Sequence, residues 1–175
     1  IKIEKCSKKL KGTEISFLPD KEIFENISFN PKKLHEFIKM KAVLVNGTSI
    51  LFDIDKQLIN DSTPTNELFF YKKGIDEFLK ENLNNKTKLF DNNFSIKYNF
   101  NQNEKCEVVI SFNQNEKSML KSYCNTIETP DGGSHENAIK NGLLKSIKLY
   151  GRKNQFTKIS NINVNDVLDY SDIII

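Results

Sequence analysis

Two short apolar runs with strict alternation constrain the fold of this chain more than any other feature. An apolar side chain stands at every second position on both sides of the polar segment 101–105; these residues are Phe94, Ile96, Tyr98 and Phe100 before it and Cys106, Val108, Ile110 and Phe112 after it. Successive side chains of a strand point to opposite faces of a sheet, so this spacing fits two strands and not a helix. The sequence therefore predicts an antiparallel hairpin with one apolar face.

Five other segments have patterns that indicate strands. Segment 13–18 alternates apolar and polar residues, and segments 50–54 and 68–71 form a pair on either side of a turn. Segment 121–127 indicates a further strand, and the three β-branched residues 173–175 are typical of a buried strand. We therefore expect a second hairpin and three single strands.

Two helices follow clear start signals. Asn30 and Pro31 are typical of an N-cap and a first helical position, so we expect a helix over residues 31–42. A second helix opens at Gly74 and ends at residues 84–85, because apolar residues recur there at spacings of three and four. Its apolar stripe consists of Ile75, Phe78, Leu79 and Leu83.

A long helix starts after the chain break at residues 129–133, and a short helix covers residues 165–170. The expected core face of the long helix consists of Ile139, Leu143, Ile147 and Tyr150. Because hairpins and helices occupy separate stretches of the chain, the sequence predicts an α+β fold in which a mixed sheet carries its helices on one face.

The length fits a single domain over residues 1–175, and 38% hydrophobic residues are enough to close a core. The three cysteines, Cys6, Cys106 and Cys124, are widely spaced and odd in number, so they predict neither a disulfide framework nor a zinc site. A reducing cytoplasm is therefore the expected location. No apolar run approaches the ~20 residues of a membrane span, so we expect no membrane partner. Because the chain begins without Met and stops within an apolar run, we interpret it as a fragment of a longer protein.

The net charge is small, so only a local basic patch could attract a polyanion such as nucleic acid. The chain has 26 basic and 23 acidic residues, which gives a weak overall field. All basic residues except Arg152 are Lys, which is typical of an AT-rich genome and argues against sequence-specific readout by Arg forks. Lys140, Lys145 and Lys148 lie away from the expected core face of the long helix. These side chains suit contact with a nucleic-acid backbone as well as plain solvation.

The segment that opens the long helix is the most informative short motif. Gly132 and Gly133 predict a tight turn, and Ser134 predicts an N-cap whose hydroxyl accepts from the amide of residue 136 or 137. A hydrolytic pair of Ser134 and His135 is excluded, because neighbours on a helix point about 100° apart. With only 7 Gly the chain has no GxxxxGK[ST] or GxGxxG loop, so we expect no catalytic, cofactor-binding or metal-binding residue.

Four segments resemble, in the same order, the B subunits of bacterial type IIA topoisomerases. Residues 125–136 resemble N-T-I-x-T-x-x-G-G-T-H, with Ser134 in place of the usual Thr. Residues 12–20 resemble G-T-x-I-x-F-x-P-D, and residues 69–75 resemble F-x-Y-x-x-G-I. Residues 165–175 resemble the run into the strand before that family's Q-T-K loop. The resemblance therefore covers nearly the whole chain.

The resemblance implies the transducer domain, the second domain of the ATPase arm, with a ribosomal small-subunit-protein-like fold and a left-handed βαβ crossover. Such a domain relays ATP-driven dimer closure to DNA strand passage within an ATP-hydrolysing enzyme. The implied partners are an A-type subunit, a second copy of the B-type subunit and double-stranded DNA, and Lys140 is the leading implied DNA contact. ATP and Mg are implied only for the full-length protein, since the family's ATP domain and its γ-phosphate-binding Lys have no match in these residues.

Residues 40–47 are closer to the K-A-V-L-x-x-G pattern of topoisomerase IV than to gyrase, whose N-N doublet before I-N-T is absent here. We therefore favour the topoisomerase IV branch of the family. Two alternatives stay open: a gyrase B transducer, and a passive interaction domain of another ATPase with the same fold. The G-G-S-H segment at residues 132–135 argues against the second alternative.

Overall fold

The computed structural model describes residues 12–83, 86–114 and 118–175, so Cys6 and the expected helix end at 84–85 lie outside the described residues. None of the described helices combines the length and the apolar character needed to cross a membrane. The elements, in chain order, are α1 (Pro31–Leu44), β1 (Ser49–Asp53), η1 (Lys56–Leu58), β2 (Asn66–Phe70), α2 (Ile75–Asn82), β3 (Phe94–Asn99), β4 (Lys105–Phe112), β5 (Leu120–Lys121), β6 (Tyr123–Cys124), β7 (Ile127–Glu128), α3 (Ser134–Lys153), η2 (Ile159–Asn161), α4 (Val164–Leu168) and β8 (Ser171–Ile174).

The two alternating runs form the hairpin that the sequence predicts. β3 and β4 pair antiparallel, with Phe94 opposite Ile110 and Tyr98 opposite Cys106. They belong to a four-stranded sheet of order β3-β4-β8-β5, in which β8 is antiparallel to β4 and parallel to β5. The sheet is therefore mixed, and the α+β class is confirmed.

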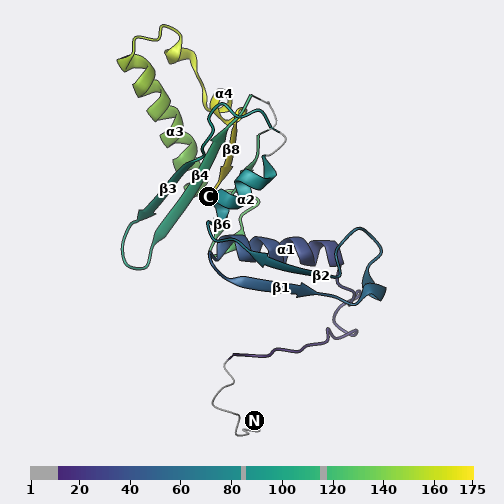
Figure 1. Cartoon of the computed structure of the whole chain (residues 1–175). Coiled ribbons are helices and arrows are strands. Elements are labelled where there is room, and N and C mark those ends of the chain that lie inside the picture. Colours follow the sequence, from purple (N-terminus) through teal and green to yellow (C-terminus); the bar gives the residue numbers. More distant parts are fainter. Residues whose placement is uncertain (1–11, 84–85, 115–117) are drawn as a thin grey trace.

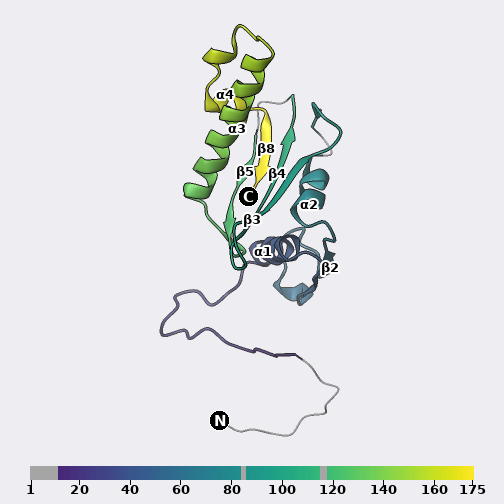
Figure 2. The same ribbon diagram turned by 90° about the vertical axis from the view of Figure 1, so that its left-hand side faces the viewer.

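The chain passes from β5 to the neighbouring parallel strand β8 through α3 and α4, as Figures 1 and 2 show. This connection is the βαβ crossover that the resemblance implies, and its left hand stays a prediction. All four residues of β8 are buried, so the expected buried strand at the end of the chain is confirmed.

Helices cover both faces of the sheet, whereas we expected them on one face. Val108 and Ile110 of β4 pack with Ile139 and Leu143 of α3 on one face. Val109, between them, belongs to the core that contains the buried residues of α2, and Figure 1 shows α2 and α3 on opposite sides of the sheet. An unbroken apolar run places apolar side chains on both faces of a strand, so both faces need cover. The single-face expectation is therefore wrong for α2 and holds for α3 and α4.

A second layer consists of α1 packed on the antiparallel hairpin of β1 and β2 (Figure 1). The expected start of α1 is confirmed, because the Asn30 side chain accepts a hydrogen bond from the Lys33 amide at 2.9 Å. His35 of α1 lies 2.7 Å from the Glu67 carboxylate, and its ring meets the ring of Phe52 edge-on. Polar and aromatic contacts thus fasten α1 to the hairpin.

The stripe expected on α2 is confirmed, because Ile75, Phe78, Leu79 and Leu83 are all buried in the core shared by both layers. The expected core face of α3 is confirmed only in its first half. Tyr150 is 64% exposed, because the second half of α3 packs on α4 and η2 and not on the sheet.

The strand expected over residues 121–127 is interrupted. β6 and β7 form a separate small hairpin, joined by Asn125 at φ 48° and Thr126 at φ 70°. Two consecutive positive φ angles make a tight reversal of the chain, which a continuous strand cannot contain. The pattern predicted the strand character of these residues and missed the turn.

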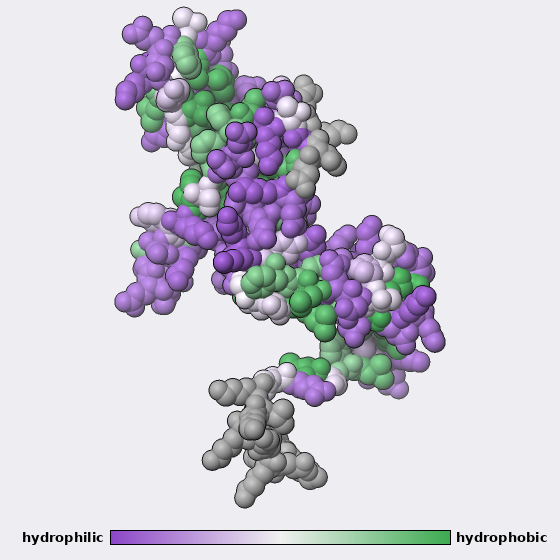
Figure 3. Space-filling model, in the orientation of Figure 1, coloured by the Kyte–Doolittle hydropathy of each residue, from purple (hydrophilic) through white to green (hydrophobic). Residues whose placement is uncertain are grey.

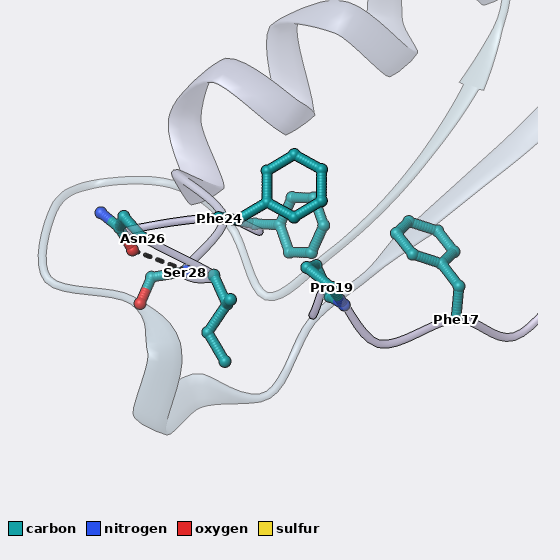
Figure 4. Close-up of a pocket in the computed structure, with 7 residues that line it drawn as sticks. Phe17, Pro19, Phe24, Asn26 and Ser28 are labelled. Carbon is teal, nitrogen blue, oxygen red and sulfur yellow. Dashed lines mark hydrogen bonds between the residues drawn. The ribbon is translucent and has the colours of Figure 1, made fainter. Parts of the chain in front are cut away.

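The strand expected over residues 13–18 is absent. Ile15 is 80% exposed and Phe17 is 73% exposed, and no strand pairs with this segment in the described part of the chain. The segment instead extends away from the two layers (Figures 1 and 2). Residues between 17 and 29 line a small hollow of about 310 Å³, where Figure 4 shows Phe17, Pro19 and Phe24 on the wall.

Candidate functional site at the start of the long helix

The two glycines before α3 leave space for two side chains that fold back from the first turn of the helix. Gly132 has a φ of 71°, and a Cβ added there would lie 2.9 Å from the carboxylate of Glu136. A Cβ added to Gly133 would lie 2.8 Å from the ring of His135. The G-G-S-H motif therefore places a carboxylate and an imidazole against the turn itself.

Glu136 is the centre of a buried polar network. Only 8% of its surface is exposed, and it is the only acidic residue of α3. The Ser122 hydroxyl donates to one carboxylate oxygen at 2.5 Å, and the Lys140 ammonium donates to the other at 2.9 Å. The hydrogen bond from Ser122, followed by that from Lys140, holds the pKa of Glu136 below its usual range, although burial acts in the opposite direction. Glu136 is therefore an ionised acceptor at neutral pH.

His135 extends the network to the strand segment before the turn. Its Nε2 lies 3.2 Å from the Thr129 hydroxyl, which lies 2.5 Å from the Ser122 hydroxyl. No carboxylate contacts the Nδ1 of His135 in the described part of the chain, so this contact lacks the third member of a hydrolytic triad. The contact therefore has a positioning role, because it fixes the first turn of α3 to Thr129, the residue that follows β7.

Segment 125–136, which carries the family resemblance, meets segment 40–47, which favours the topoisomerase IV branch, at the β6–β7 turn. The Lys41 ammonium, near the end of α1, donates to the Thr126 carbonyl oxygen at 2.5 Å and to its hydroxyl at 3.0 Å. This contact joins the layer of α1, β1 and β2 to the small β6–β7 hairpin that leads into α3. Sequence reasoning named both segments and gave no signal that they touch.

The expected cap at Ser134 is wrong. Gly133 is the N-cap residue, the Ser134 hydroxyl makes no capping hydrogen bond, and the Asn137 amide donates to the Gly133 carbonyl oxygen. Because the chain is extended at Gly133, the helix begins one residue earlier than a Ser134 cap requires. Ser134 is exposed in the first helical turn.

We expect Ser134→Ala to change the free energy of unfolding by less than ~0.5 kcal/mol, as for an exposed residue without partners. The matched variant Asn30→Ala should cost ~1 kcal/mol, because Asn30 caps α1. Urea denaturation of both variants measures the difference. Equal losses from the two variants would restore the capping role of Ser134.

We expect Glu136→Gln to lower the free energy of unfolding at pH 7 by about 1.5–3 kcal/mol, the range for hydrogen bonds to a charged group. Since the folded-state pKa is lowered, the stabilisation from the charge is complete above the unfolded-state pKa and is lost as the pH falls through the folded-state value. The stability difference between parent and variant should therefore narrow on acidification from about pH 5. Denaturation curves across this range, with the exposed Glu128→Gln as control, would show an unchanged gap if the charge has no role.

The three lysines proposed as DNA contacts do not share one face of α3. At about 100° per residue, Lys140 points about 140° away from Lys145, whereas Lys148 is about 60° from Lys145. Lys140 is half-buried and bound to Glu136, so its ammonium is not free. Arg152 was not among the predicted contacts, yet it stands only about 20° from Lys145 on the helix. A row of i, i+3 and i+7 basic residues is the signal that would have found it.

The described residues contain no group of three or more His, Cys, Asp or Glu side chains close enough to hold a metal ion. Cys106 and Cys124 are both free thiols. The site therefore offers a positioned polar network and a basic helix row.

The fold defines an α+β protein in which a long crossover helix is fixed to a mixed sheet through a glycine turn. A family model described as DNA gyrase B matches residues 74–175, which is more than half of the chain. The chain therefore belongs to the DNA gyrase B family, the B subunits of type IIA topoisomerases.

Similar curated proteins include the B subunit of DNA topoisomerase 4 from Rickettsia felis, with 33% identity over 98% of this chain and 26% of the relative. The corresponding protein of Caulobacter vibrioides is 30% identical over 91% of this chain and 24% of the relative. The chain thus spans about a quarter of the length of these relatives.

Two solved structures share the fold. The 43K ATPase domain of Thermus thermophilus gyrase B, solved with an aminocoumarin, is 27% identical, with a TM-score of 0.67 over 89% of this chain and 41% of that chain. The B-subunit of the DNA gyrase from Myxococcus xanthus has a TM-score of 0.74 over 96% of this chain and 47% of that chain, at 16% identity. The second likeness concerns the fold alone.

Proposed function

We propose that residues 1–175 are the transducer domain of the B subunit of a DNA topoisomerase IV, which relays ATP-driven dimer closure to DNA strand passage. The observation that carries this proposal is the hydrogen bond from Ser122 to the buried carboxylate of Glu136, which Lys140 also binds and which ties the start of α3 to the segment between β5 and β6. A relay needs such rigid elements, because a flexible joint would absorb a rotation and not transmit it. The named topoisomerase 4 relatives support the branch.

The proposed assembly is an ATP-hydrolysing type II topoisomerase, in the cytoplasm, with an A-type subunit, a second copy of the B-type subunit and double-stranded DNA as partners. ATP and Mg are proposed for the full-length protein. A gyrase B transducer is the second candidate, which the likeness to the Thermus thermophilus gyrase B domain supports.

The proposed DNA contact is the basic row on α3, consisting of Lys145, Lys148 and Arg152. No acidic residue of α3 lies on this row, because Glu136 is the only one in the helix and faces Ser122. Lys140, which the resemblance implies as the leading contact, remains a proposed contact, and its ammonium must first leave the carboxylate of Glu136. Phosphate contacts of this kind carry no base preference.

The test is the salt dependence of duplex binding by the chain. Three phosphate contacts predict a log–log slope of about −3, since each contact contributes about 0.9. Arg152→Gln should reduce the slope by about 1, and Lys33→Gln on α1 should leave it unchanged. In the assembled enzyme, Arg152→Glu should lower DNA relaxation more than ATP hydrolysis without DNA. Equal effects of Arg152→Glu and Lys33→Glu on relaxation would contradict the DNA role of the row.

A further inference from the structure

A polar cleft of about 370 Å³ lies between α2 and the β3–β4 hairpin, away from α3. Its floor is the face of the hairpin that bears Ser95, Lys97 and Glu107, opposite to the face that packs on α3. Figure 3 shows hydrophilic side chains gathered over the middle of the molecule, where Figure 1 places α2. The lining residues are Asn46, Lys72, Lys73, Asp76, Lys80, Asn92, Asn93, Ser95, Lys97 and Glu107.

The cleft has an excess of positive charge, because four lysines line it against two carboxylates. Both carboxylates are already paired: Asp76 lies 3.0 Å from the Lys80 ammonium, and Glu107 lies 2.8 Å from that of Lys97. Neither Lys72 nor Lys73 has a carboxylate partner for its ammonium among the described residues. The Glu77 carboxylate, nearby, accepts from the Lys73 backbone amide at 3.0 Å. Two ammonium groups thus remain available at the rim.

Fixed contacts hold the walls of the cleft. The Asn93 amide donates to the Asp76 carboxylate at 3.0 Å, which ties the segment before β3 to α2. Asn46, from the end of α1, lies directly over Gly74, the N-cap residue of α2. Since the walls come from separate elements and are bound to one another, the site is largely formed before any ligand enters, as binding clefts usually are.

We propose that this cleft binds a small phosphate-bearing anion, with Lys72 and Lys73 as its charged ligands and Asn92 and Ser95 as neutral hydrogen-bond donors. Unpaired ammonium groups beside amide and hydroxyl donors match the charge and the acceptor oxygens of a phosphate group. The phosphate could belong to a free polyphosphate or to the DNA backbone. The position of the cleft on the face opposite to α3 separates it from the basic row, so the free anion is the source we favour.

The experiment is an NMR titration of the ¹⁵N-labelled chain with inorganic pyrophosphate and, in parallel, with a short DNA duplex. Pyrophosphate should shift the amides of residues 72–73, 92–93 and 95–97, and Lys72→Gln/Lys73→Gln should weaken its binding about tenfold or more. The control Lys32→Gln/Lys33→Gln changes the exposed lysine pair of α1 and should leave binding unchanged.

Each other result overturns the proposal. Equal weakening by the two double variants would show nonspecific attraction to surface lysines. Shifts at the cleft with the duplex and none with pyrophosphate would assign the cleft to DNA and not to a free anion. All four exchanged lysines are exposed, so both double variants should stay folded. The same NMR spectra check this. The titration needs neither ATP nor another protein. Its outcome is therefore independent of whether the chain is a transducer domain.

Discussion

Replacing Asp172 with alanine is expected to lower the free energy of unfolding by about 3–5 kcal/mol, the range for breaking a buried ion pair from one side. Asp172 lies in β8 and is fully buried. Its carboxylate accepts from the Lys86 ammonium at 2.7 and 2.9 Å, from the Asn113 amide at 2.6 Å and from the Met119 backbone at 2.8 Å. Removing it withdraws the acceptor from three donors in three separate segments.

Urea denaturation of Asp172→Ala beside the exposed Asp91→Ala measures this effect. The control should stay within ~0.5 kcal/mol of the parent chain. Asp172→Asn should fall between them, because the amide keeps one acceptor oxygen and loses the charge that Lys86 needs. A loss below ~1 kcal/mol for Asp172→Ala would mean that water replaces the carboxylate, and the interior would then be less closed than the structure shows.

The sequence predicted those elements well in which apolar residues recur with one clear spacing. Alternation predicted β3 and β4, and the apolar stripe from Ile75 to Leu83 predicted the buried face of α2, because period 2 and period 3.6 exclude one another. The sequence also contains a signal for helices on both faces of the sheet. Val108, Val109 and Ile110 are consecutive apolar residues, and such a run indicates a strand covered on both faces.

Other features depend on contacts that no local pattern contains. In the sequence, Asp172 is a polar residue directly before three apolar ones, and nothing nearby indicates that it is buried. Its partners Asn113 and Met119 lie more than fifty positions away. The turn at Asn125 and Thr126 needs positive φ angles in residues other than Gly, which a strand pattern does not announce.

The glycines predicted the position of the candidate site correctly, but the prediction of the residue that binds there was wrong. The motif at residues 132–135 predicted a tight turn before a helix, and the turn is present. A Ser at a helix start is a common N-cap residue, and this preference led to the wrong prediction for Ser134. Gly132 instead makes room for Glu136, whose partner Lys140 stands four positions along the helix. That spacing favours an ion pair, so the sequence did contain a reason to expect the Lys140 ammonium to be bound to Glu136.

Gly74→Ala is expected to lower the free energy of unfolding by about 2–4 kcal/mol, through backbone strain and overpacking together. Gly74 has a φ of 57° and a ψ of −127°, a combination that L side chains avoid. A Cβ built there would lie 2.0 Å from the Asn46 side-chain oxygen and 2.6 Å from its Cγ. The substitution must therefore move Asn46 as well as strain the start of α2.

Gly142→Ala is the same exchange at a different glycine, and it is expected to raise the free energy of unfolding. Gly142 lies within α3, and a Cβ added there meets no atom within 4 Å. Alanine should stabilise the chain by about 0.5–1 kcal/mol, because glycine is the poorer helix former. Thermal melts of both variants should move in opposite directions. Asn46 lines the cleft and lies against Gly74, so Gly74→Ala should weaken pyrophosphate binding, whereas Gly142→Ala should not. Equal pyrophosphate binding by the two variants would show that the cleft does not depend on the position of Asn46.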